Sequence, residues 1–165
     1  MRISKWGEYG ILCCLYLAKR AITLQDTKNP VGAAELAHAQ SIPLEYAQQI
    51  LQKLRKGDVV DSVRGPGGGY RLSRESKDIN LRDILVAAEG DTFEVMCDKN
   101  SIFEDCSNAQ GACSLKAVWH ELRETIDSYL VSKTLEELAS EDLATGRLDV
   151  ASDLVQLSAV KTIAE

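Results

Sequence analysis

The stretch that decides the fold runs from residue 44 to residue 73 and reads LEYAQQILQKLRKGDVVDSVRGPGGGYRLS. Its first part predicts a helix that begins near Pro43, because proline is favoured in the first helical turn, and that ends at Gly57. Four apolar residues recur at the i, i+3, i+4 and i+7 spacing of a buried helix face: Ala47, Ile50, Leu51 and Leu54. The opposite face would present side chains that form hydrogen bonds, namely Tyr46, Gln48, Gln49, Gln52 and Lys53.

The second part of the stretch predicts a β-hairpin. Residues 59–63 contain three β-branched valines and indicate a strand, residues 65–69 (GPGGG) indicate a turn, and residues 70–72 a returning strand. Arg64 would stand at the tip, beside glycines that allow a close approach to another molecule. A nucleotide-binding loop would need GxxxxGK[ST] and a following helix, and this segment has neither.

The residues before this stretch supply the other half of a DNA-binding motif. Residues 32–40 (GAAELAHAQ) are rich in helix formers, and Ser41-Ile42-Pro43 then breaks the helix. Two short helices, a tight break and a hairpin predict a winged helix-turn-helix. A buried helix over residues 4–18 and an amphipathic helix over residues 80–90 complete a DNA-binding domain expected at 1–90.

The rest of the chain predicts a cysteine-bearing loop and a second long helix. Residues 91–113 are polar, whereas residues 114–140 predict a helix of roughly 18 residues and a short helix after it. The long helix carries an apolar stripe: Leu115, Val118, Trp119, Leu122, Ile126, Tyr129 and Leu130. The stripe indicates dimerisation, with packing on the chain's own domain as the alternative. The fold class is therefore mainly α with a small β-wing, a winged helix-turn-helix plus a long dimerisation helix. Residues 141–165 form an acidic tail without an assigned role.

Charge and composition agree with a cytoplasmic DNA-binding protein. The net charge is −6, but residues 1–72 carry ten Lys and Arg against six Asp and Glu, so a phosphate-binding surface is expected in this half. The longest apolar run, residues 11–18, ends at Lys19, so no membrane span is expected. No small-residue cleavage site follows a basic start, so no signal peptide is expected. Five cysteines in a reducing compartment favour a metal, a reactive thiol or burial over disulfides. No Ser/His/Asp set or HExxH motif points to an enzyme.

The starting residues MRIS and the run SVRGPGGGY resemble the IscR/NsrR/RirA-type winged-helix repressors (Rrf family), over roughly residues 1–139. The resemblance implies that Tyr46, Gln48 and Gln49 face the major groove and that Arg64 enters the minor groove. It also implies phosphate contacts from Arg2, Lys5, Lys53, Arg55 and Lys56. Gln48 stands where IscR-like relatives have glutamate, which leaves the operator sequence open.

Cys97, Cys106 and Cys113 are separated by eight and six residues. By spacing alone they suit an iron-sulfur cluster, a zinc site or redox thiols. The family resemblance implies a [2Fe–2S] or [4Fe–4S] cluster. Lys116 stands where IscR-like members have a histidine ligand, whereas Glu8 matches the carboxylate that NsrR-like members use, so the fourth ligand is expected to be Glu8 of the partner subunit. His120 is a weaker candidate.

These features predict a DNA-binding transcriptional regulator, a repressor or dual regulator, and not an enzyme. Its iron-sulfur cluster would sense redox state, nitric oxide or iron supply, and two subunits would bind a double-stranded operator. The alternative is a cluster-free winged-helix regulator that is controlled by cysteine oxidation or by a partner protein.

Overall fold

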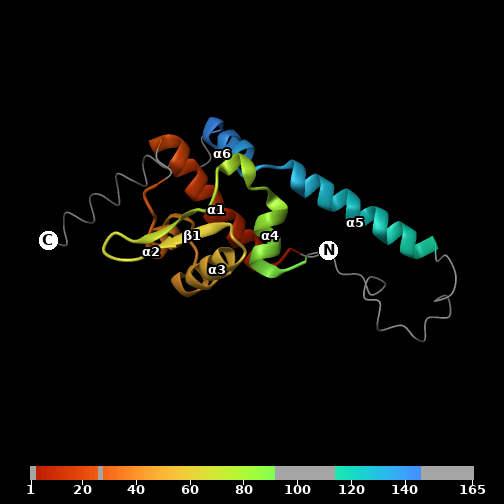
Figure 1. The fold of residues 1–165 in the computed structure, drawn as a ribbon, viewed down its shortest axis with the longest axis horizontal. Coiled ribbons are helices and arrows are strands. Elements are labelled where there is room, and N and C mark those ends of the chain that lie inside the picture. The colour runs from red at the N-terminus through yellow and green to blue at the C-terminus, as the bar shows by residue number, and fades with distance from the viewer. Residues whose placement is uncertain (1–2, 26–27, 92–113, 146–165) are drawn as a thin grey trace.

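The computed structural model describes residues 3–25, 28–91 and 114–145, and the fold is given for these ranges (Figure 1). Helix α1 (Lys5–Leu24) is central to it, because α2, α3, α4 and α6 all contact this helix. Helix α1 begins after Ser4, whose hydroxyl accepts a hydrogen bond from the Trp6 amide, and ends before Gln25 in the left-handed conformation. A Cβ on Gly10 would lie 3.0 Å from the Ala88 Cβ, so this small residue lets α4 approach closely.

Helix α1 is longer than the sequence indicated. The prediction ended near Ala18, where Lys19 and Arg20 interrupt the apolar run, but the helix continues to Leu24. Both basic side chains have acidic partners in the fold: Lys19 pairs with Asp142, and Arg20 pairs with Glu35 of α2. Because these ion pairs compensate the charges, the helix stays packed beyond the apolar segment.

Helices α2 (Ala33–Ala39) and α3 (Leu44–Lys56) form the predicted helix-turn-helix. The break between them is held by Ile42, which is buried and whose amide donates to the Ala37 carbonyl at 2.8 Å. The four residues of the predicted core face of α3, residues 47, 50, 51 and 54, have no exposed area. Pro43 and Gly57 are the N-cap and C-cap of α3, so its predicted bounds are confirmed.

The predicted hairpin is also present. Strands β1 (Val60–Val63) and β2 (Gly69–Leu72) pair antiparallel, with Val60 opposite Leu72 and Val63 opposite Gly69. Tyr70 exchanges two backbone hydrogen bonds of 2.8 Å with Val31, so the segment before α2 joins the hairpin. The fold is thus the winged helix-turn-helix that the sequence predicts.

Helical elements follow the hairpin for the rest of the described chain. The turn η1 (Ser76–Asp78) leads into α4 (Leu81–Glu89), which Asn80 caps through a reciprocal bond with Asp83. Helix α5 (Ser114–Ser132) extends away from the body (Figure 1). The chain then returns along the start of α4, where the Leu81 amide donates to the Lys133 carbonyl at 3.0 Å and the Leu135 amide to the Ile79 carbonyl at 2.8 Å.

Helix α6 (Leu135–Ala144) packs against α1 and η1. Its N-cap is Thr134, whose hydroxyl accepts a hydrogen bond from the Glu137 amide, the i to i+3 spacing of a capping box. The sequence placed the end of the last helix at residue 140 and the start of the tail at residue 141. The helix instead runs to Ala144, because Asp142 lies in its last turn and pairs with Lys19 on α1.

Candidate nucleic-acid interface and cofactor ligands

The exposed face of α3 is polar. Gln48, Gln49 and Gln52 are exposed, on the side opposite the buried residues of this helix. A glutamine amide both donates and accepts, so this face can form paired hydrogen bonds with base edges in a major groove. The geometry therefore presents the predicted reading residues Gln48 and Gln49 to the outside of the molecule.

Two other predicted contact residues of α3 are held by neighbours. Tyr46 is 43% exposed, and its ring lies against Trp6 and Tyr9 of α1, with centroid distances of 5.4 and 6.3 Å. The Lys53 ammonium group donates to the Ala88 carbonyl at 3.0 Å and lies 4.2 Å from the centre of the Trp6 ring. Lys53 is therefore not a free surface cation, although the sequence pattern placed it on the polar face.

The hairpin presents Arg64 at its tip, where this side chain is exposed. The turn is closed by a 2.9 Å hydrogen bond from the Gly68 amide to the Gly65 carbonyl, and Gly65 and Gly67 have φ values of 105° and 78° that suit glycine. At the base, the Arg71 guanidinium of β2 lies 3.9 Å from the Asp61 carboxylate of β1. The hairpin is therefore a fixed arm that carries a cation at its end.

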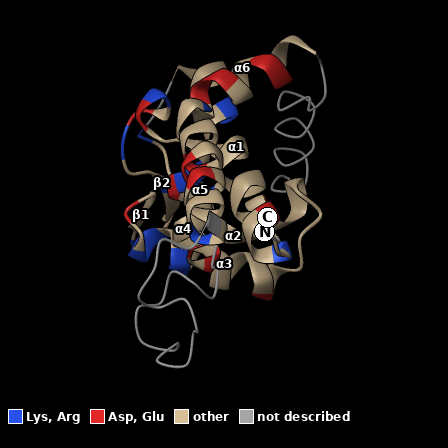
Figure 2. Cartoon of the chain, turned by 90° about the vertical axis from the view of Figure 1, so that its right-hand side faces the viewer, with Lys and Arg blue, Asp and Glu red and all other residues tan. Residues whose placement is uncertain are grey.

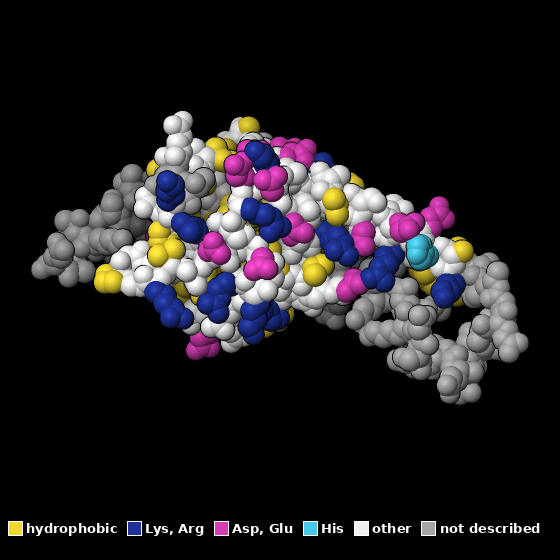
Figure 3. All heavy atoms as spheres, in the orientation of Figure 1, with side chains coloured by type: hydrophobic (Ala, Val, Ile, Leu, Met, Phe, Trp, Pro, Cys, Tyr) yellow, Lys and Arg dark blue, Asp and Glu magenta, His cyan; other side chains and the backbone are white. Residues whose placement is uncertain are grey.

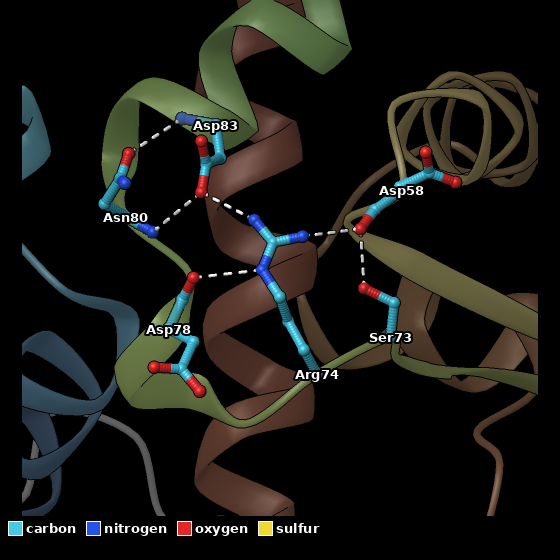
Figure 4. A network of polar contacts seen from close by, with 6 residues as sticks. All are labelled: Asp58, Ser73, Arg74, Asp78, Asn80 and Asp83. Carbon is cyan, nitrogen blue, oxygen red and sulfur yellow. Dashed lines mark hydrogen bonds and ion pairs between the residues drawn. The ribbon is translucent and has the colours of Figure 1, made fainter.

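A network around Arg74 attaches the hairpin to the body (Figure 4). Its guanidinium donates to the carbonyls of Asp58 at 2.8 Å and Asp78 at 2.9 Å, and to the Asp83 carboxylate at 2.6 Å. Ser73 also donates to the Asp58 carbonyl, at 2.6 Å. One side chain thus joins the end of α3, the end of β2 and the start of α4. Arg74 has no recognisable signal in the sequence, because its partners are distant in sequence or are backbone groups.

Basic side chains gather near α3 and the strands. Asp and Glu colour much of α6, whereas Lys and Arg lie near α3 and the strands (Figure 2). The space-filling view shows basic side chains along the lower edge, over α3 and the hairpin (Figure 3). Lys5 and Lys56 are exposed, and Arg55 donates to the Ser62 hydroxyl at 3.3 Å. The surface around α3 is therefore the one suited to a polyanion.

The candidate cofactor ligands divide between described and undescribed residues. Cys97, Cys106 and Cys113 lie outside the described residues, as does Arg2. Glu8 is exposed on the first turn of α1, and Lys116 and His120 are exposed on α5, where His120 Nδ1 is 3.4 Å from the Glu124 carboxylate. Within the described ranges, no three His, Cys, Asp or Glu residues are grouped to hold a metal ion.

The other two cysteines are core residues. Cys13 and Cys14 on α1 have no exposed area and are free thiols. Burial raises the pKa of Cys13 to about 12, and burial together with the neighbouring Cys13 raises the pKa of Cys14 well above its ordinary value. These thiols are therefore kept protonated, because burial disfavours the charged thiolate.

Helix α5 carries large apolar side chains that are exposed. Leu115, Val118 and Tyr129 are 52%, 54% and 63% exposed. Leu130 alone among the predicted stripe is buried, at the end where α5 meets the body. Arg82 of α4 holds the helix by an ion pair of 3.0 Å with Asp127. Over the described residues, no helix is both long and apolar enough to cross a bilayer.

The helix-turn-helix, the hairpin with its arginine tip and the polar face of α3 define the winged-helix class of DNA-binding proteins. The family model of Rrf2, described as an iron-dependent transcriptional regulator, matches residues 3–141. The chain is 34% identical over 142 residues to the HTH-type transcriptional regulator IscR of Vibrio atlanticus, which covers 86% of this chain and 77% of the relative. It therefore belongs to the Rrf2 family of transcriptional regulators.

Solved structures agree with this assignment. T. potens IscR is 29% identical with a TM-score of 0.62, and the match covers 86% of this chain and 88% of that one. CymR of B. subtilis, described as the global cysteine regulator, is 30% identical with a TM-score of 0.65 over 86% of this chain and 98% of that one. An oxidized form of Staphylococcus aureus CymR is 26% identical with a TM-score of 0.62, over 84% and 96% of the two chains.

Proposed function

We propose that this regulator binds an operator through α3, the hairpin and the first turn of α1, and that an iron-sulfur cluster on Cys97, Cys106 and Cys113 controls that binding. The proposed DNA-binding surface is inferred mainly from the exposure of Gln48 and Gln49 on α3, next to the hairpin that carries Arg64 at its tip. These three side chains would read base edges and groove shape.

Phosphate contacts would fix the protein on the duplex. Lys5 is exposed at the start of α1, and Arg2 precedes it in the sequence. We assign both to phosphate contacts, together with Lys53. Because the Lys53 ammonium already has the Ala88 carbonyl and the Trp6 ring as neighbours, a phosphate would be a further partner of a cation that is already oriented.

The donor set suits iron. Thiolates are the usual ligands of iron-sulfur clusters, and three cysteines leave one coordination position for another group. A [2Fe–2S] or [4Fe–4S] cluster would supply redox chemistry and reactivity toward nitric oxide, and it would also respond to iron supply. The iron-dependent description of the family supports iron over zinc. Among the described residues, Glu8 is the exposed carboxylate that this proposal requires.

The fourth ligand would be Glu8 of the partner subunit, in a homodimer formed through α5. The apolar side chains that α5 leaves exposed support a second copy of this chain as their cover. Lys116 is a poor ligand for iron, and His120 has a carboxylate of its own helix as a neighbour. A ligand supplied across the dimer would couple the cofactor to the spacing of the two DNA-binding surfaces.

A cluster-free regulator is the second candidate. The likeness to the oxidized form of Staphylococcus aureus CymR favours control by cysteine oxidation, and a partner protein is the other possibility. Anaerobic purification separates the two candidates. Iron and sulfide in the protein, with visible absorption that is lost in Cys106→Ala, would support the cluster, whereas a colourless protein without iron would overturn it.

The switch is tested by gel shift with cluster-loaded and cluster-free protein on one duplex. We expect the two forms to differ in affinity, and equal affinities would remove the cluster as the control. For Glu8, mixed dimers that combine one Glu8→Ala subunit with one Cys106→Ala subunit are decisive. Ligation across the dimer leaves one site with all four ligands, whereas ligation within a subunit leaves none.

A further inference from the structure

The first turn of α1 lies in contact with both α3 and α4, and Trp6 makes the contact to α3. The centre of the Trp6 ring is 5.4 Å from that of Tyr46, and the Lys53 ammonium lies 4.2 Å from the Trp6 ring. Tyr46 and Lys53 are seven residues apart, which is two turns of a helix. The indole therefore touches α3 near both of its ends.

The same turn is fixed to α4 on its other side. The Ser4 amide donates to Glu89 Oε2 at 3.0 Å, and the Ser4 hydroxyl donates to the same oxygen. A Cβ on Gly7 would lie 2.6 Å from Glu89 Oε1 and 2.8 Å from a methyl of Leu85. The turn has no room to move toward α4, so a displacement of its residues must shift the other residues that it contacts.

Lys53 on α3 contacts both α4 and Trp6 of α1. Its ammonium group donates to the Ala88 carbonyl in the last turn of α4, where a cation is favoured. The three elements thus meet at one indole ring and one ammonium group. Glu8 lies on this same turn of α1 and is exposed.

We infer that Trp6 is a positioning residue that transmits a displacement of the first turn of α1 to the recognition helix α3. The inference deepens the proposed function, since it rests on Glu8 as the residue by which the cofactor pulls on this turn. The contact between Trp6 and α3 does not itself depend on a cofactor. Tyr46 is the residue through which the change would reach the DNA-facing side.

The first test measures operator affinity for cluster-loaded and cluster-free protein. The probe is a duplex selected from a random-sequence pool by binding to the wild-type protein. Coupled sites typically change affinity by about 5- to 150-fold. We expect Trp6→Phe to keep most of the wild-type ratio, because a ring still packs on Tyr46, and Trp6→Leu to bring the ratio toward one with unchanged cluster absorption. A wild-type ratio in Trp6→Leu would overturn the inference.

The second test needs no cofactor. The chain has two tryptophans, Trp6 and Trp119, so Trp119→Phe leaves Trp6 as the sole tryptophan, which is excited selectively at wavelengths where tyrosine does not absorb. In this cluster-free variant we expect duplex binding to change the emission of Trp6, because Tyr46 and Lys53 reorganise against it. Emission that does not change when the duplex binds contradicts the inference, whatever the cofactor does.

The matched control for the second test is Trp6→Phe, in which all tryptophan emission comes from Trp119 on α5. The emission of Trp119 should respond less to the duplex than that of Trp6. An equal response would show that the duplex changes the whole protein and not the surroundings of Trp6 in particular. The two tests also distinguish failure of the proposed function from failure of the inference about Trp6. If the wild-type affinity ratio is one, the proposed control by the cluster is wrong, and the emission of Trp6 still decides whether it senses α3.

Discussion

The ammonium group of Lys19 on α1 pairs with the Asp142 carboxylate in the last turn of α6, across 123 residues of sequence. The Lys19 side chain has no exposed area, whereas 26% of the Asp142 side chain is exposed. A buried cation without a counterion is costly, so Asp142 compensates the one charged residue that the described core contains. Helix α6 is therefore held to the DNA-binding body by charge as well as by apolar packing.

Asp142→Asn should lower the free energy of unfolding by about 3 kcal/mol, because it leaves the Lys19 charge buried without a partner. Lys19→Met should cost much less, since Asp142 can be solvated and the methionine fills similar space. Urea unfolding of both variants and of the double variant measures the coupling. Equal losses from the two single variants would show that the pair is not the reason that Lys19 is tolerated.

The Arg74 network predicts a position-specific requirement for arginine. A lysine keeps the charge but cannot form the three directed hydrogen bonds to Asp58, Asp78 and Asp83. We expect Arg74→Lys to lower the free energy of unfolding by about 1–2 kcal/mol. Because the hairpin is attached here, duplex affinity should also fall.

The matched control is Lys77→Ala, which removes an exposed cation from the neighbouring turn. Lys77 pairs with Glu75, which raises the Lys77 pKa and lowers the Glu75 pKa, but both side chains are exposed to solvent. No measurable change in unfolding is expected. If Arg74→Lys behaves like this control in denaturant unfolding, the network is not what holds the base of the hairpin.

Arg64 should contribute to DNA binding through the fit of its guanidinium group in a narrow groove, and not through its charge alone. In the proposed complex, Arg64→Ala should weaken operator binding by about 1–3 kcal/mol. Arg64→Lys keeps the charge, so a simple phosphate contact would survive it, whereas insertion of the guanidinium into a narrow groove would not. Competition binding on duplexes with A·T-rich and G·C-rich flanks distinguishes these outcomes. Retention of the wild-type preference in Arg64→Lys would assign the tip to phosphate contact.

The local patterns of the sequence were sufficient for the winged motif. The spacing of residues 47–54, the break at Ser41-Ile42-Pro43 and the glycine run after Arg64 each act within a few residues. Such signals depend on nearby backbone geometry, and they can be recognised without knowledge of the tertiary fold. The helices, hairpin and core face that they predicted are present.

Other features depend on residues that only the fold brings together. Lys19 ends an apolar run in the sequence, yet it is buried because Asp142 reaches it from α6. Lys53 has the spacing of a solvated residue, but Trp6 and Ala88 occupy its ammonium group. At the candidate site, the types of side chain that could bind DNA or a cofactor can be recognised in the sequence. The exposure of Glu8 and the orientation of Tyr46 cannot, because they follow from packing between helices.

The contact between Gly69 and Val31 predicts a strict requirement for glycine. A Cβ at residue 69 would lie 2.3 Å from the Val31 carbonyl oxygen, which bonds to Tyr70 at 2.8 Å. Gly69→Ala should therefore break this link and lower the free energy of unfolding by about 1–3 kcal/mol. Gly32→Ala is the control, because an added Cβ there meets nothing within 4 Å. Thermal unfolding of both variants tests the prediction, and similar midpoints would contradict it.

The buried thiols of Cys13 and Cys14 predict which cysteines cannot act as sensors. The thiolate is the reactive form, and a pKa of about 12 leaves roughly one thiol in ten thousand ionised at pH 8. In folded, cluster-free protein, iodoacetamide should leave Cys13 and Cys14 unmodified, whereas both should react in guanidinium, where burial no longer raises the pKa. Peptide mapping by mass spectrometry measures each site. Any control by cysteine oxidation would then depend on the other three cysteines. Rapid modification of Cys13 in the folded protein would contradict the prediction and would make Cys13 a candidate for oxidation.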